Sequence, residues 1–402
     1  MNLFSFFKKK SSLTVVFDIR EFTLTSAVTR IYKNKKPEIL YCQDFKIDES
    51  ELILYKKYTA SLLKTLDKGI TEMHSIIQKM GIKEEIGQFF FFIGSPWVVS
   101  QSKDIKYTKD KEFTIDDAFL KRILVSQENN WQKNIEETQG SGSWELLEEK
   151  IIQAKLNGYK VDKIYDRKTK DIEIHLFTSF IPKEIINKLN SYIEEKFGQK
   201  TDQHSHSQTL SSFTFMRDLF PNRNNFIYID IGKKITDIYV VREDIIHGIS
   251  SFPFGEDAII ESVSKKEGLT KEIIQSLINI KSHGKCDEES ERKVNNIIDD
   301  GLSMWVEKFN ESIPKICLEK DVPFEIFIIT NSDLLNLFVG RIKQENYNHP
   351  VRIYGKKPSI TQISEGTFNN FIINGKIFKK QPFIKMDIIL LDKLDKQKPL
   401  YA

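Results

Sequence analysis

The chain has 402 residues, of which 40% are hydrophobic and 29% are charged, and its formal net charge is +3. This size and apolar content are enough to bury the cores of roughly two to four domains. The near balance of charges excludes a strong attraction for nucleic acid or other polyanions. No apolar stretch approaches the about 18 residues that a membrane-spanning helix needs. The cysteines Cys42, Cys286 and Cys317 form no C-x-x-C pair, which argues against a disulfide framework or a zinc site and favours a reducing, cytoplasmic compartment.

The N-terminal segment, residues 1–12, places four large apolar residues ahead of three lysines. A secretory signal has its positive charge first and a longer apolar core, so this segment is not one. We expect a docking peptide that enters a partner's groove or sits shallowly in lipid, and a frayed tail is the alternative. The expected partner-binding residues are Leu3, Phe4, Phe6 and Phe7.

Residues 13–96 have the pattern of the first part of an α/β domain. A short apolar strand ends in Asp18, and two further extended runs follow before a helix whose apolar residues recur every three or four positions. A second apolar run, Q-F-F-F-F-I, is typical of a strand covered on both faces. The predicted elements are strands at 13–18, 22–32 and 38–45, a helix at 55–80 and a strand at 88–93.

From Trp97 the pattern changes to that of a compact α+β insert, which we place at residues 97–199. Asn157-Gly158 predicts either a hairpin or a short irregular connection. The other predicted elements are a helix from Thr114 to about Glu128, a loop at Gly140-Ser141-Gly142, a short helix from Trp144, a strand at 171–180 and a helix from Pro182 to Phe197. The polar segment 198–212 is predicted to be a linker, within a connecting region at 200–225.

The second half repeats the beginning of the first. A strand from Phe226 ends in Asp230, and two extended runs joined by a tight turn follow it. This repetition predicts a duplicated two-lobe α/β fold. The remaining predicted elements are helices at 257–267, 270–281 and 287–315, a core strand at 324–330, a helix capped by Ser332 or Asp333, and extended segments that include 386–391.

With these elements in place, the chain resembles the actin-like ATPases with a ribonuclease H-like fold, and in particular their FtsA/PilM branch. The segment Lys155-Leu156-Asn157-Gly158-Tyr159 resembles the L-N-G-Y signature of the SHS2-type insert of that branch, and Ser95-Pro96-Trp97 resembles the entry to the insert. The resemblance implies subdomain 1A at 13–96, the insert at 97–199, a return to 1A at 200–225, subdomain 2A at 226–256 and 316–402, and a helical subdomain 2B at 257–315.

The resemblance also implies a site for ATP and Mg²⁺, formed by one turn from each half. Phosphate oxygens approach such turns closely because glycines leave the backbone N–H groups bare. In this chain Arg20 and Glu21 follow the first aspartate, Lys233 and Lys234 replace glycines of the second turn, and Thr330-Asn331 stands where a glycine pair would contact adenosine. The positions that still match are Asp18, Asp230, Gly232, Thr236 and Asp237.

We therefore expect a pseudo-ATPase with weak or lost nucleotide binding and no catalytic or metal-ligating residues. It would serve as a self-associating scaffold of cell division or type IV pilus assembly at the inner face of the membrane, with Trp97 among its partner contacts. Its partner would be a membrane-associated protein, not nucleic acid. The alternative is an active ATPase with divergent phosphate loops, and a sugar kinase ranks last. His204 and His206 fit a solvated linker better than a metal site.

The C-terminal residues also indicate which segment would attach the protein to a membrane or a partner. FtsA-like members carry a C-terminal amphipathic helix, whereas residues 395–402 are polar and contain Pro399. This difference favours the N-terminal peptide as the docking segment, as in PilM. The Ser95-Pro96-Trp97 segment favours a division-type relative, so the pathway stays open between the two.

Overall fold

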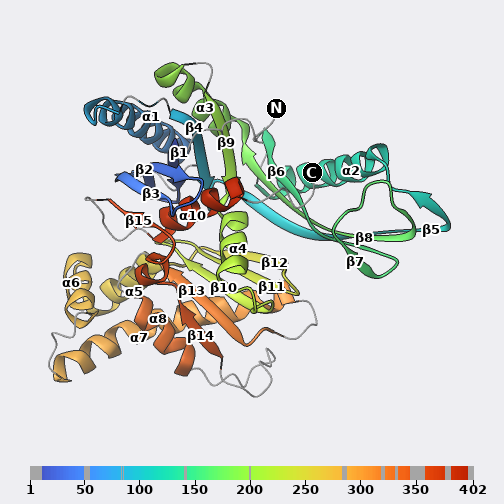
Figure 1. The fold of residues 1–402 in the computed structure, drawn as a ribbon. Coiled ribbons are helices and arrows are strands. Elements are labelled where there is room, and N and C mark those ends of the chain that lie inside the picture. Colours follow the sequence, from blue (N-terminus) through green and yellow to red (C-terminus); the bar gives the residue numbers. More distant parts are fainter. Residues whose placement is uncertain are drawn as a thin grey trace. The chain divides into compact units, whose positions relative to one another are not determined.

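The computed structural model describes residues 11–48, 55–82, 84, 86–139, 143–198, 201–282, 288–317, 322–330, 334–344, 358–375 and 382–396. The chain divides into two compact units, whose elements are labelled in Figure 1. Unit 1 comprises Met1–Met216, Phe371–Lys379 and Phe383–Ala402, and unit 2 comprises Arg217–Asn370 and Lys380–Pro382.

A six-stranded sheet with the order β15-β3-β2-β1-β4-β9 forms the centre of unit 1. β1 is antiparallel to β2, to which a tight turn joins it, and parallel to β4, which the chain reaches through a helix. Phe17, Phe89 and Phe91 are fully buried on the face that α1 and α3 cover. The elements are β1 (Ser11–Ile19), β2 (Thr23–Tyr32), β3 (Glu38–Lys46), α1 (Tyr55–Lys79), β4 (Ile86–Ile93), α3 (Lys183–Phe197), β9 (Asp202–Ser207), α4 (Gln208–Leu219), β15 (Ile373–Asn374) and α10 (Pro382–Lys396).

The insert belongs to unit 1 and has its own four-stranded antiparallel sheet, with the order β5-β8-β6-β7. Apolar residues of α2 pack on one face of this sheet and form a separate small core around Phe119, Leu156 and Ile174. Asn157 and Gly158 both have positive φ, as the hairpin between β6 and β7 requires, so of the two alternatives that the sequence left open the structure shows the hairpin. The elements are β5 (Val99–Thr114), α2 (Asp117–Gln139), β6 (Trp144–Leu156), β7 (Tyr159–Val161) and β8 (Lys168–Pro182).

Unit 2 contains a five-stranded sheet with the order β12-β11-β10-β13-β14. Helix α7 contributes Trp305 and Phe309 to its core, and α8 contributes Phe338. The elements are β10 (Phe226–Ile231), β11 (Thr236–Arg242), β12 (Ile245–Phe252), α5 (Glu256–Glu267), α6 (Lys271–Ser282), α7 (Glu288–Cys317), β13 (Glu325–Thr330), α8 (Leu335–Gln344), β14 (Ser359–Gln362) and α9 (Glu365–Phe368).

The duplication predicted from the sequence is confirmed by topology and register. The orders β3-β2-β1-β4-β9 and β12-β11-β10-β13-β14 are equivalent strand for strand. In the first hairpin Asp18 lies opposite Thr25, and in the second Asp230 lies opposite Asp237. Each turn is closed by a corresponding backbone hydrogen bond of 2.9 Å, from Arg20 N to Thr23 O and from Gly232 N to Ile235 O.

Several local predictions for the insert and the linker are wrong. Residues 144–156 form strand β6 and not a helix, because β6 pairs along its length with β8. Helix α2 is longer than expected, and Asp116 caps it through a 2.7 Å bond from Phe119 N, since Thr114 is still paired in β5. The predicted linker instead contains strand β9, which pairs with β4, and the start of helix α4, where Gln208 donates a hydrogen bond to Asp18.

The C-terminal part also differs from the prediction. Residues 382–396 form helix α10 and not extended segments. Subdomain 2A was expected to run to residue 402, but Phe371–Lys379 and Phe383–Ala402 group with unit 1. The strand pattern was misleading because residues 382–391 of α10 are all buried, so this part lacks the exposed polar stripe of a surface helix. The predicted cap at Ser332 or Asp333 and the loop at Gly140-Ser141-Gly142 lie outside the described residues.

Candidate functional site

The turn after β1 is filled by a side chain of unit 1 itself. Asp18 lies one residue before the end of β1 with its carboxylate buried, and Arg20 Nε lies 3.2 Å from Asp18 Oδ2. The guanidinium carbon of Arg20 lies 3.2 Å from the centroid of the Phe383 ring on α10, which is a cation–π contact. Arg20 therefore folds back onto its own unit and takes the place where the resemblance expects a bare glycine.

Helix α4 connects this turn to α10. Gln208 Nε2 donates to Asp18 Oδ1 at 2.8 Å and to Asp387 Oδ2 at 2.9 Å. Ser211 Oγ donates to Asp387 Oδ1 at 2.8 Å. Burial, together with the nearby charge of Asp18, raises the pKa of Asp387 well above its ordinary value. The carboxylates of Asp18 and Asp387 thus share one amide donor.

Hydrogen bonds to three backbone carbonyls fix the shape of the turn after β1. The indole Nε1 of Trp97 donates to Arg20 O at 3.0 Å, the Tyr58 hydroxyl donates to Glu21 O, and Ile47 N donates to Phe22 O at 2.8 Å. The rings of Tyr58 and Trp97 stack at 4.4 Å. Trp97 is fully buried, so its position corrects the prediction that this side chain contacts a partner: it anchors the first turn.

The turn after β10 is held by the helix that follows the hairpin. The N–H groups of Glu256 and Asp257, at the start of α5, donate to Gly232 O at 3.1 Å and to Lys233 O at 2.7 Å. A helix N-terminus offers such N–H groups to anions when they are free. Here the carbonyls of the turn use two of them. Gly255 permits this close approach, because a Cβ there would lie 2.4 Å from Gly232 O and 2.5 Å from Lys233 C.

The other predicted residues of unit 2 lie around this turn. Asp230 is buried at the end of β10, and Asp237 Oδ1 accepts a hydrogen bond from the Ser251 hydroxyl. Thr236 is fully buried: its hydroxyl donates to Phe254 O at 2.7 Å and accepts from Trp305 Nε1 at 2.9 Å. Thr236 therefore connects the hairpin to the core of unit 2.

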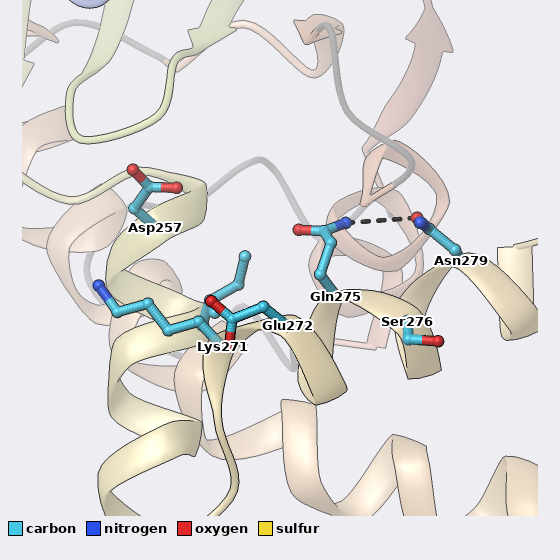
Figure 2. Close-up of a pocket in the computed structure, with 7 residues that line it drawn as sticks. Asp257, Lys271, Glu272, Gln275, Ser276 and Asn279 are labelled. Atoms are coloured by element: carbon cyan, nitrogen blue, oxygen red, sulfur yellow. Dashed lines mark hydrogen bonds between the residues drawn. The ribbon is translucent and has the colours of Figure 1, made fainter. Parts of the chain in front are cut away.

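A cavity of about 460 Å³ lies between α5 and α6 in unit 2 (Figure 2). Lys271 Nζ bonds to Glu261 Oε1 at 2.6 Å, and this bond lowers the pKa of Glu261. Gln275 Nε2 donates to Asn279 Oδ1 at 3.3 Å along α6. The cavity adjoins the second turn through Asp257, whose N–H is the one bonded to Lys233 O. Its lining residues are Asp257, Ile260, Lys271, Glu272, Gln275, Ser276 and Asn279.

The structure places four of the matching positions, Asp230, Gly232, Thr236 and Asp237, around the turn after β10 in unit 2, and Asp18 alone at the turn after β1 in unit 1. It also adds residues that the sequence analysis missed. Gln208 and Asp387 were missed because one was assigned to a linker and the other to an apolar strand. Asp387, a charged residue inside the apolar run 382–391, was the sequence feature that could have indicated a buried polar contact there. Thr330 bonds to Glu256 in unit 2. Asn331 and the predicted docking residues Leu3, Phe4, Phe6 and Phe7 lie outside the described part of the chain.

The two linker histidines lie in strand β9. The ring of His204 stacks on Phe90 with centroids 4.7 Å apart, and His206 stacks on Phe92 at 5.6 Å. His206 Nδ1 also lies 3.3 Å from Glu148 Oε2. Both histidines therefore pack on the sheet of unit 1, which corrects the prediction of a solvated linker.

Comparison with solved structures identifies the fold. A chain of the "PilM-PilN type IV pilus biogenesis complex" superimposes with a TM-score of 0.59, covering 94% of this chain and 98% of that chain at 8% sequence identity. The ethanolamine utilization protein EutJ from Carboxydothermus hydrogenoformans gives a TM-score of 0.43, covering 89% and 87% at 9% identity. No protein-family model and no curated protein matches the sequence. The protein has the fold of this chain of the PilM–PilN complex, which agrees with the fold that the resemblance to the FtsA/PilM branch implies.

Among the helices of the described residues, none has the length and apolar character required to cross a membrane.

The contact of Gly255 with the second turn predicts a specific loss of stability. In Gly255→Ala the new methyl group meets backbone atoms that cannot rotate away, so we expect the free energy of unfolding of unit 2 to fall by about 1–3 kcal/mol. The matched control is Gly340→Ala in α8, where no atom lies within 4 Å and alanine favours the helix by about 0.5–1 kcal/mol. Scanning calorimetry measures both, and equal midpoints for the two variants would contradict the close packing.

Proposed function

We propose that the protein is a PilM-like scaffold of the FtsA/PilM type in which nucleotide binding is weak or lost. The observation that carries this proposal is the position of Arg20 between Asp18 and Phe383. A phosphate group needs space and unoccupied N–H donors at this turn. Arg20 fills the space with its own side chain, and Glu21, buried beside it, would repel a polyanion.

The second turn supports the same proposal less strongly. Gly232 is retained, and the ammonium groups of Lys233 and Lys234 are suitable partners for phosphate. The N–H groups of Glu256 and Asp257 at the start of α5, however, already donate to the carbonyls of this turn and are not free for a phosphate. Any residual affinity for ATP and Mg²⁺ would therefore come from unit 2, whose candidate residues are Asp230, Gly232 and Asp237.

We further infer that the scaffold binds a membrane-associated protein of the division or pilus machinery. The support is the fold shared with a chain of a complex that, by its name, assembles PilM with PilN in type IV pilus biogenesis. The insert is the proposed partner-binding module, because it has its own core and exposes Tyr159, 78% accessible, at its hairpin. The N-terminal residues Leu3, Phe4, Phe6 and Phe7 are a second proposed contact. The protein would act at the inner face of the membrane and self-associate.

Titration with ATP and Mg²⁺ tests the proposed loss of nucleotide binding. If the dissociation constant exceeds the ligand concentration, ATP raises the free energy of unfolding by less than about 0.4 kcal/mol. We therefore expect no resolved heat by calorimetry and no shift of the melting temperature at millimolar MgATP. Clear binding to the wild-type protein that disappears in Asp230→Ala would instead establish the alternative, a functional ATP-binding protein.

Capture from solubilised membranes tests the partner. We expect the full chain, cross-linked and analysed by mass spectrometry, to retain a component of the pilus or division machinery. Tyr159→Asp, on the exposed hairpin of the insert, should reduce this capture about tenfold or more, as the loss of a central aromatic contact does. Gly340→Ala serves as the folded control. A chain that stays monomeric in sedimentation analysis and retains no such component would overturn the scaffold proposal.

A further inference from the structure

A buried glutamate of the insert binds the junction between β9 and α4. Glu148 lies on β6, and its Oε1 accepts hydrogen bonds from Ser207 N at 2.9 Å and from the Ser207 hydroxyl. Its Oε2 lies 3.3 Å from His206 Nδ1. Only 5% of the Glu148 side chain is exposed. The Ser179 hydroxyl of β8 also donates to Oε1, at 3.4 Å. These partners stabilise the carboxylate, because a buried charge without partners is costly.

The same junction binds the turn after β1 and the C-terminal helix. Ser207 Oγ accepts the N–H of Leu210 at 3.2 Å, so it caps the first turn of α4. The next residue, Gln208, holds both Asp18 and Asp387 with one amide nitrogen. Ser211, one turn further along, donates to the other oxygen of Asp387.

The geometry makes this network sensitive to small displacements. Ser207, Gln208, Ser211 and Asp387 are each at most 2% exposed, so water cannot replace a lost protein donor. Gln208 Nε2 sits at 2.8 and 2.9 Å from its two acceptors, and a shift of about 1 Å would break the geometry of at least one bond. A change at Glu148 therefore reaches Asp387 through a few rigid, buried contacts.

We propose that the β9–α4 junction, residues 207–211, couples the insert to the turn after β1 and to helix α10. Glu148 acts as a positioning residue: it sets the first turn of α4, and Gln208 and Ser211 transmit that position to Asp18 and Asp387. A displacement of Glu148 in the insert changes the stability of α10 through this junction. That a bound partner supplies the change rests on the proposed function, whereas the coupling itself does not.

Hydrogen–deuterium exchange of the full chain, without any partner, tests this coupling. In Glu148→Gln we expect exchange to accelerate about tenfold or more in α10 and in residues 19–23, because the hydrogen bonds from Ser207 to a charged carboxylate are lost. Within the described part of the chain, Glu148 forms no hydrogen bond to either region, so the effect would have to pass through the junction. The matched control is Glu145→Gln, on the same strand with an exposed side chain, which should leave both regions unchanged. Acceleration confined to β6, β9 and α4 would overturn the proposal.

A second experiment tests the same coupling in the opposite direction, with Ser211→Ala, a variant with a smaller risk of misfolding. Coupling acts in both directions, so Ser211→Ala should accelerate exchange in β6 around Glu148 as well as in α10. The melting shifts of Glu148→Gln and Ser211→Ala should also be non-additive in the double variant. Additive shifts, or exchange in β6 that is unaffected by Ser211→Ala, would contradict the coupling. Because no ATP and no partner is added, this outcome is independent of the tests of the proposed function.

Discussion

The buried carboxylate of Asp18 imposes the constraint on which unit 1 depends. A carboxylate removed from water needs charged or hydrogen-bonding partners, and here unit 1 supplies Arg20 from the same turn and Gln208 from α4. Phe383 of α10 covers the guanidinium, and the carboxyl of Asp387 shares the Gln208 amide. Breaking a buried pair of this kind by removing one partner typically costs about 3–5 kcal/mol. The turn, α4 and α10 therefore stabilise one another.

The two units hold the turn after their first strand by different contacts. In both, a strand ends in a buried aspartate and a tight turn is closed by equivalent backbone hydrogen bonds. In unit 1 the side chain of Arg20 fills the turn, whereas in unit 2 Gly232 keeps the backbone bare and the N-terminus of α5 packs against it across Gly255. Duplication has thus preserved the backbone while the chemistry of each turn has diverged. The two turns therefore differ in chemistry, and each bonds to groups of its own unit.

The sequence was sufficient for the features that depend on local patterns. The strand–aspartate–hairpin unit and the helix after it were predicted because period and turn chemistry specify them directly. The Asn157-Gly158 hairpin was one of two alternatives, because the polar residues around it also fitted an irregular connection. Strand β6 and helix α10 were not, because tertiary pairing decides the first and burial on all sides conceals the period of the second. Gln208 and Asp387 are far from Asp18 in sequence, so only the folded chain shows that they meet. Arg20 was recognised as a departure, but its partner Phe383 could not be inferred from its position.

The proposed loss of nucleotide binding depends on Arg20 being a structural residue of unit 1 that occupies the turn where a phosphate would bind. A high-resolution crystal structure of the protein grown with millimolar MgATP tests it most directly. We expect the guanidinium of Arg20 on Asp18 and on the ring of Phe383, with Gln208 bridging to Asp387 and no ordered nucleotide at residues 19–22. Electron density for phosphates bound to the N–H groups of this turn, with Arg20 displaced from Asp18, would contradict it.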